Sequence, residues 1–204
     1  KDYKPDIVGF NVYTGNHIQL AEAYARLKKD FKNIITMVGG PHPTYFPAES
    51  AEYSDYVVMS EGFGGLRKIL TNSIQPGILP MGDTQHFPLP DRETFYSDYP
   101  EHASSKIKSI ITMTGCPYTC TYCYNSSTTK ELAENLPPKL AAALGKNMSR
   151  SGRLFPKNVR DIDQVIEEGK LIAENWPTKV IYFQDDIFGF NTKKGGMLEQ
   201  MAER

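Results

Sequence analysis

The cysteines of this 204-residue sequence, Cys116, Cys120 and Cys123, all lie in one short segment. An odd number of cysteines packed this closely is a poor disulfide framework and favours metal ligation by thiolates. Structural zinc usually takes four protein ligands, and neither a fourth cysteine nor a histidine follows Cys123. Three thiolates suit a [4Fe-4S] cluster with one iron left open to a small molecule. The alternative is that these are incidental thiols, because free cysteine often packs as a small hydrophobe.

Polar residues and glycines follow three short apolar runs in the first third of the chain, at residues 7–12, 34–38 and 56–59. The candidate binding residues at these ends are Asn11, Gly39, Gly40, His42, Glu61 and Gly62. In open parallel sheets, ligands bind beyond the carboxyl ends of the strands. Bare backbone at a Gly-Gly pair would let a bulky cofactor approach closely, although a tight turn is the alternative for the pair.

The elements that must position these residues alternate between strands and helices. Residues 20–31 space their apolar side chains at helical intervals between the first two apolar runs. Such alternation predicts a parallel sheet and an α/β fold. Residues 75–105 are rich in proline and glycine, which predicts a surface linker. We therefore expect one domain at residues 1–74 and a second at residues 106–204.

The second domain is expected to repeat the alternation. Residues 107–113 predict a strand that runs into the cysteine segment, and residues 161–175 predict a helix. Residues 179–183 predict another strand, which ends at Asp185 and Asp186. Each of these two carboxylates could cap the turn that follows.

The motif Cys-x3-Cys-x2-Cys, with the aromatic residue Tyr122 before its last cysteine, resembles the radical S-adenosylmethionine superfamily. The resemblance implies that the open iron binds the methionine part of S-adenosylmethionine and that one-electron reduction releases a 5′-deoxyadenosyl radical. It places Tyr122 near the adenine and polar groups such as Asp185 and Asp186 near the cosubstrate's amino group. Core packing is the alternative role of Tyr122. The resemblance also implies a small-molecule substrate and an electron donor such as flavodoxin or ferredoxin.

The first domain is similar to the second half of the cobalamin-binding domains that precede many radical S-adenosylmethionine barrels. The residues that carry this resemblance are 5–11, 38–44 and 55–62. It implies a partial Rossmann-like parallel sheet of the cobalamin-binding type, followed by the first βα units of a radical S-adenosylmethionine (β/α) partial barrel. Two features depart from the pattern: residues 60–63 read Ser-Glu-Gly-Phe where Gly-Glu-Gly-Glu is frequent, and Asn11 replaces a frequent serine.

Charge and hydropathy exclude other classes of partner. The formal net charge is −1, which gives no basic footprint for nucleic acid. The apolar runs are far shorter than a bilayer crossing, so we expect no membrane span and a cytoplasmic location. The sequence begins directly before a strand and ends within a helical pattern, so we expect a fragment of a longer chain.

These observations favour a cobalamin-dependent radical enzyme that transfers a methyl group or carries out a related C–H activation. A methylthiotransferase of the same superfamily is an alternative, but that branch carries further cysteines in its leading domain and none precedes Cys116 here. The second alternative is a non-catalytic interaction module that binds zinc or structural iron through the thiols.

Overall fold

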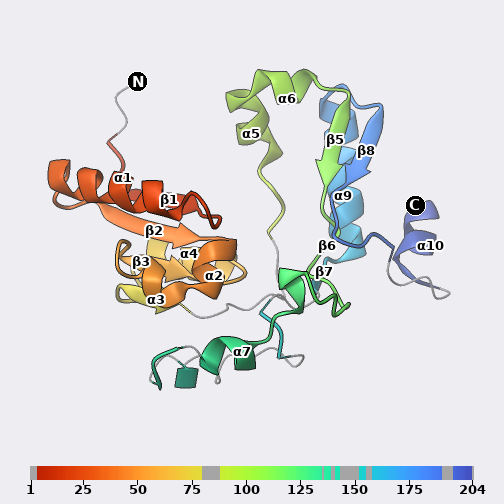
Figure 1. Ribbon diagram of the computed structural model, residues 1–204. Helices are drawn as coiled ribbons and strands as arrows, with labels where there is room; N and C mark the ends of the chain where they lie inside the picture. The colour runs from red at the N-terminus through yellow and green to blue at the C-terminus, as the bar shows by residue number, and fades with distance from the viewer. Residues whose placement is uncertain are drawn as a thin grey trace. The chain divides into compact units, whose positions relative to one another are not determined.

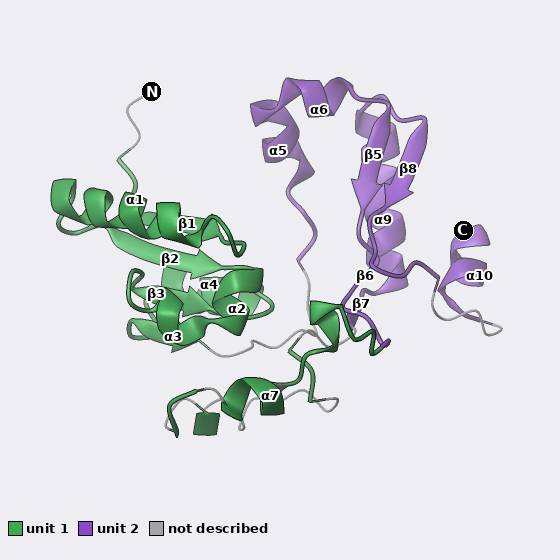
Figure 2. Ribbon diagram, viewed as in Figure 1, with its two compact units in different colours: residues 1–84, 119–155 green, residues 85–118, 156–204 purple. Residues whose placement is uncertain are grey.

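The computed structural model describes residues 4–79, 88–134, 136–138, 141–142, 152–154, 158–189 and 195–203. The chain divides into two compact units, shown in Figure 2. Unit 1 comprises residues 1–84 and 119–155, and unit 2 comprises residues 85–118 and 156–204. Each unit has its own sheet and its own buried apolar clusters.

Unit 1 is built on a sheet of four parallel strands (Figure 1). In their order across the sheet they are β1 (Ile7–Asn11), β2 (Ile35–Gly39), β3 (Tyr56–Val58) and β4 (Gly77–Leu79). All three residues of β3 are buried, as expected for an inner strand covered on both faces. This sheet confirms the parallel α/β arrangement that the sequence predicts for the first part of the chain.

Helices cover both faces of this sheet. Tyr24 of α1 (His17–Asp30) packs with Val57, whereas Ile69 of α4 (Phe63–Leu70) packs with Val58. Because successive strand residues point to opposite faces, α1 and α4 lie on opposite sides of the sheet. Further helices that the structure describes in this unit include α2 (Pro41–Tyr45), α3 (Pro47–Ser50), the 3₁₀ turn η1 (Tyr124–Ser126) and α7 (Thr129–Glu134).

Asp55 joins three elements at the amino edge of the sheet. Its carboxylate accepts hydrogen bonds of 2.9 Å from both the backbone N–H and the hydroxyl of Thr36, and it forms an ion pair with Lys28 of α1. Burial raises the pKa of Asp55, but the hydrogen bonds from Lys28 and Thr36 outweigh this and bring the pKa below its usual value. The carboxylate therefore fixes the start of β3 relative to β2 and α1.

Unit 2 contains two short sheets. β5 (Ile107–Ile110) pairs in parallel with β8 (Val180–Phe183), and β6 (Met113–Thr114) pairs antiparallel with β7 (Asn158–Val159). α9 (Ile162–Asn175) connects the second sheet to β8 and packs Val165 and Ile172 against Ile110. β5, α9 and β8 make one βαβ unit, the repeating element of a (β/α) barrel, and the predicted partial barrel stays a prediction. α10 (Met197–Ala202) follows.

A buried ionic network ties α9 to the rest of unit 2. Glu168 of α9 is 1% exposed and receives hydrogen bonds from Arg92 and Arg160. The same two guanidinium groups also donate to backbone carbonyls, Arg92 to Ser109 at 2.7 Å and Arg160 to Ile111 at 2.8 Å. Pairing of this kind is what allows a carboxylate to be buried.

The stretch at residues 75–105 differs from the predicted linker. It contributes β4 to the sheet of unit 1, and it contains α5 (Arg92–Asp98) and α6 (Pro100–Ser104). Composition alone hid these elements because β4 has three residues and both helices are short. The local signals were helix starts: Asp91 accepts a 3.0 Å hydrogen bond from the Thr94 N–H, and Pro100 occupies the first turn of α6.

Among the described helices, none has both the length and the apolarity that a bilayer crossing demands.

Candidate functional site

The carboxyl ends of β1, β2 and β3 lie side by side in unit 1. The strand register pairs Asn11 with Gly39, and Gly39 with Val58. Beyond the strands, the Val12 N–H donates to Gly39 O at 2.8 Å and the His42 N–H donates to Val12 O at 3.0 Å. The structure therefore brings the strand ends that the sequence singled out to one edge of one sheet.

Gly40 has a backbone conformation that demands glycine. Its φ is +100°, and a Cβ at this position would lie 1.8 Å from Asn11 Oδ1 and 3.1 Å from the Val12 N atom. A side chain at residue 40 would therefore push into the β1 loop. Gly40 is therefore required by the close approach of the β1 loop, as in a tight turn, and its contact with a cofactor stays a prediction.

The turn at residues 60–62 forms the third part of the edge. Ser60 adopts a φ of 58°, which is uncommon for a residue other than glycine, and its N–H donates to Thr44 Oγ1 at 2.8 Å. One carboxylate oxygen of Glu61 accepts from the Phe63 N–H, and the other is buried without a hydrogen-bond partner among the described residues. A Cβ at Gly62 would meet nothing within 4 Å. The turn therefore carries a buried acceptor without a partner among the described residues, next to a glycine whose Cβ position is open.

His42 does not lie at the surface of this edge, because its side chain is 2% exposed. Its ring stacks on His17 with a centroid distance of 4.2 Å, and its Nδ1 lies 3.1 Å from the Thr14 hydroxyl. Its Nε2 is buried without a hydrogen-bond partner in the described part of the chain and lies 4.0 Å from Glu49 Oε1. Burial, and secondarily the neighbouring His17, lower the pKa of His42. The ring is therefore held in its neutral form at neutral pH.

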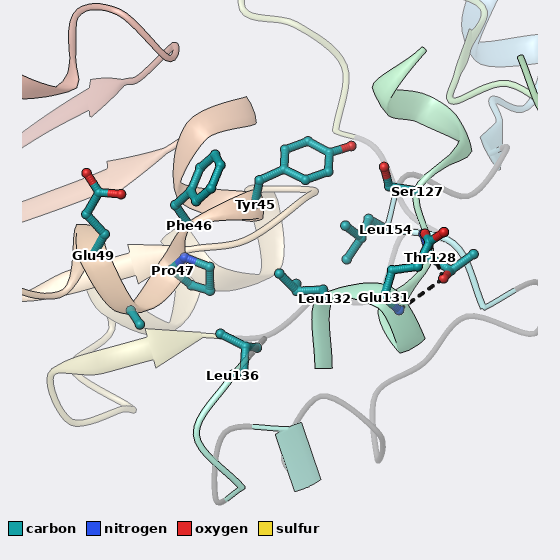
Figure 3. Close-up of a pocket in the computed structure, with 11 residues that line it drawn as sticks. Tyr45, Phe46, Pro47, Glu49, Ser127, Thr128, Glu131, Leu132, Leu136 and Leu154 are labelled. Atoms are coloured by element: carbon teal, nitrogen blue, oxygen red, sulfur yellow. Dashed lines mark hydrogen bonds between the residues drawn. The ribbon is translucent and has the colours of Figure 1, made fainter. Parts of the chain in front are cut away.

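A pocket of about 410 Å³ opens between α2–α3 and α7 within unit 1 (Figure 3). Its walls are mostly apolar and include Phe46, Pro47, Leu132 and Leu136. Figure 3 shows Tyr45 extending toward Ser127 at one end. The volume falls in the range of small-molecule sites.

Tyr45 also connects the sheet edge to the cysteine segment. Its hydroxyl donates to the backbone carbonyl of Tyr124, the residue after Cys123, and the two tyrosine rings meet edge to face at 6.1 Å. Burial raises the pKa of Tyr45 to about 12, so the hydroxyl keeps its proton. α2, which begins directly after Gly40, therefore contacts the end of the cysteine segment.

The cysteine segment is shared between the two units. Cys120, which is exposed, and Cys123, which is half-buried, belong to unit 1, where the Cys123 N–H donates to Cys120 O at 3.1 Å. Ser126 Oγ closes this turn with hydrogen bonds of 3.1 and 2.7 Å to the carbonyls of Cys120 and Cys123. Cys116 is half-buried and belongs to unit 2. None of the three cysteines forms a disulfide. Their spacing in the sequence is the reason to expect that they share one cluster.

Asp185 is already engaged by the protein. Its Oδ1 accepts hydrogen bonds from the N–H groups of Thr112 at 2.6 Å and Met113 at 3.1 Å, and its Oδ2 accepts from the Thr112 hydroxyl. The carboxylate thus holds the backbone that leads into the cysteine segment from β5. Asp186 and Tyr122 are exposed, Tyr122 to 91%. Contact of these three residues with a cosubstrate stays a prediction.

Sequence reasoning missed several residues of the edge. Glu49 lies on the four-residue helix α3, and folding brings its carboxylate within 3.6 Å of His17 Nε2. The segment between β2 and β3, which contains α2 and α3, brings Glu49 close to His17. The residue types alone did not indicate this contact. The bond from Tyr45 to Tyr124 spans 79 positions and was equally hidden.

A comparison with known protein families finds a match in the part of the chain that forms this edge. Residues 1–70 match the family model described as B12 binding domain. The first 70 residues are thus similar to B12 binding domains. This match supports cobalamin as a cofactor of the B12-binding region (residues 1–70), and the parallel sheet is consistent with the Rossmann-like fold of such domains.

One relative extends the similarity beyond this region. The chain is 24% identical, over an alignment of 221 positions, to the uncharacterized methyltransferase PH0819 of Pyrococcus horikoshii. The match covers 95% of this chain and 42% of the relative, so the chain spans less than half the relative's length.

The residues present fit both groups that the sequence implies. The open space at Gly62 and the oxygen of Glu61 without a partner among the described residues suit a large cofactor with amide side chains. Three disulfide-free thiols offer the soft donor set that iron–sulfur clusters use.

Proposed function

We propose that this chain belongs to a cobalamin-dependent radical S-adenosylmethionine enzyme that methylates a small molecule or carries out a related C–H activation. The observation that carries the proposal is the presence, in one chain, of a B12-binding region and of cysteines spaced Cys-x3-Cys-x2-Cys. The name of the relative, a methyltransferase, supports methyl transfer as the reaction class.

Contacts within unit 1 support joint action of the two sites. Tyr45 follows the Gly39-Gly40 strand end by five residues and bonds to the carbonyl of Tyr124, directly after Cys123. A cofactor on the sheet edge and a cluster on the cysteine segment would thus be linked through one short helix. Methyl transfer assisted by a second cofactor needs such proximity, because reacting groups must be held together.

On the cobalamin side, this chain supplies shape and hydrogen-bond acceptors. Gly40 lets the β1 loop pack closely over the strand end, and Glu61 Oε2 would accept hydrogen bonds from amide groups at the corrin periphery. When bound, cobalamin supplies a carrier for the methyl group.

On the cluster side, Cys116, Cys120 and Cys123 would each ligate one iron. When bound, a cluster with one open iron supplies the electron for reductive cleavage of S-adenosylmethionine. Asp185 would position the cysteine segment through Thr112 and Met113, and Asp186 and Tyr122 would contact the cosubstrate. A carrier such as flavodoxin or ferredoxin would bring the electrons.

The test uses the protein encoded by the complete reading frame around this sequence, reconstituted with iron and sulfide without oxygen and then reduced. Incubated with S-adenosylmethionine, it should release 5′-deoxyadenosine, which chromatography of the quenched reaction measures. A Cys120→Ser variant should release none. If a protein with a full, reducible cluster gives no 5′-deoxyadenosine, the cysteine segment has a structural or electron-carrying role and the proposal fails.

A further inference from the structure

We propose that His17, His42 and Glu49 form a second metal site in unit 1, which binds a divalent transition-metal ion such as Zn²⁺ independently of the cysteine segment. The inference does not rest on the proposed function, because it concerns different residues and a different ligand. It follows from the arrangement of three donor groups around one point beside the carboxyl edge of the sheet.

Folding brings the three donors together from three elements: His17 begins α1, His42 lies in α2 and Glu49 lies in α3. Their ligand atoms all lie within 4.8 Å of one another. Glu49 Oε1 is 3.6 Å from His17 Nε2 and 4.0 Å from His42 Nε2. Ligands of a tetrahedral zinc ion are about 3.3 Å apart, given bonds of about 2.0–2.1 Å. The two distances to Glu49 Oε1 exceed this spacing by about 0.3 and 0.7 Å, and the stacked imidazole rings must turn for both Nε2 lone pairs to meet one ion.

The buried Nε2 of His42 points independently to a ligand. This atom has no hydrogen-bond partner among the described residues although the side chain is 2% exposed. Buried polar atoms normally have a partner, so an unmade bond at this position needs an explanation. A metal ion between His42 and Glu49 would satisfy it.

The hydrogen bonds of His42 already suit metal binding by Nε2, whereas the ring proton of His17 must move. The Thr14 hydroxyl lies 3.1 Å from His42 Nδ1 and can accept its proton, which leaves the Nε2 lone pair for a metal. The Gly15 N–H donates to Nδ1 of His17 at 3.1 Å. For His17 Nε2 to bind a metal, the ring proton must move to Nδ1. Nδ1 then no longer accepts a hydrogen bond, so the Gly15 N–H must donate to water instead. Gly15 is exposed, so its N–H can do so.

The donor set indicates the class of ion. Two imidazoles and one carboxylate suit zinc and neighbouring first-row metals rather than calcium or magnesium, which prefer oxygen ligands. Three protein ligands also leave a position for water or an external ligand.

The experiment uses the untagged 204-residue chain in which the three cysteines are replaced by serine, so that thiolates cannot bind the probe. After chelator treatment and dialysis, calorimetry with Zn²⁺ should give about one equivalent bound. Co²⁺ should develop the visible bands of a nitrogen- and oxygen-ligated ion. Glu49→Gln and His17→Asn should each weaken Zn²⁺ binding at least about tenfold, as loss of a ligand does.

The matched control is Glu52→Gln, which changes an exposed carboxylate just after α3 and should leave Zn²⁺ affinity unaltered. Circular dichroism checks that each variant is folded. If the serine background does not fold, Glu49→Gln in the wild-type chain should lower the Zn²⁺ stoichiometry by about one. Absence of Zn²⁺ binding by the folded serine background, or equal binding by Glu49→Gln, His17→Asn and Glu52→Gln, would overturn the proposal.

Discussion

At the scale of single residues, the edge of the sheet in unit 1 depends on Gly40 and on the polar groups around it. Gly40 combines a positive φ with a Cβ position that Asn11 Oδ1 already fills. The same carboxyl edge carries a buried oxygen of Glu61 without a partner among the described residues. The close packing at Gly40 and the buried oxygen of Glu61 make this edge sensitive to substitution.

Gly40→Val should therefore reduce the cobalamin retained by the 204-residue chain. The added side chain would clash with Asn11 Oδ1 and displace the β1 loop, which forms part of the edge proposed to hold the cofactor. Gel filtration after incubation with hydroxocobalamin, followed by absorbance of the protein peak, measures retention. Gly77→Val is the control, since Gly77 also has a positive φ but begins β4 and has no atom within 4 Å of its Cβ position. Equal retention by the two folded variants would contradict the predicted role of Gly40.

Asp185 is a second residue for which the structure adds a role within the protein. The sequence predicts contact with a cosubstrate, and the structure shows three hydrogen bonds from Thr112 and Met113. A carboxylate that accepts backbone N–H groups is a strong local constraint, because charge-assisted hydrogen bonds exceed neutral ones.

Asp185→Ala should destabilise the chain by about 2 kcal/mol, because it leaves two backbone N–H groups without their acceptor. Urea unfolding followed by circular dichroism measures the loss. Glu174→Gln, which changes an exposed carboxylate on α9, should change stability by less than about 0.5 kcal/mol. A stability of Asp185→Ala equal to that of Glu174→Gln would show that these hydrogen bonds contribute little.

At the scale of elements, short helices and a carboxylate with its ion pair position side chains and strands at the two edges of the sheet. α2 and α3 each have five or fewer residues and begin with proline, yet they place His42, Tyr45 and Glu49 around the sheet edge. At the opposite edge, Asp55 joins α1, β2 and β3.

The Asp55 junction should make the stability of unit 1 depend on pH. The folded-state pKa of Asp55 lies below its unfolded value of about 3.9, so its stabilisation is present above about pH 4 and is lost as pH falls through the folded pKa. Asp55→Asn should therefore be less stable than wild type at pH 7, by about 1–2 kcal/mol, and the gap should narrow below pH 4. Denaturation curves at several pH values test this. A gap that stays constant below pH 4 would exclude Asp55 as its source.

At the scale of the whole molecule, the sequence predicted the parts with strong local signals. Apolar runs revealed β1, β2 and β3, and the spacing of α1 marked its buried face. β4, α5 and α6 were missed because short elements in a proline-rich stretch lack periodicity. The contacts of Glu49 with His17 and of Tyr45 with Tyr124 were hidden because they join residues far apart in sequence. The acceptor role of Asp185 depends on the pairing of β5 with β8 and had no local signature.

We propose that one chain joins a B12-binding region to a cluster with one open iron on Cys116, Cys120 and Cys123. Iron, sulfide and zinc analysis of the anaerobically reconstituted 204-residue chain tests the cluster most directly. A cluster on these cysteines should give about four irons and four sulfides per chain. Each single Cys→Ser variant should lose most of this iron and sulfide. Bound zinc without sulfide, or iron and sulfide content undiminished in all three variants, would contradict it.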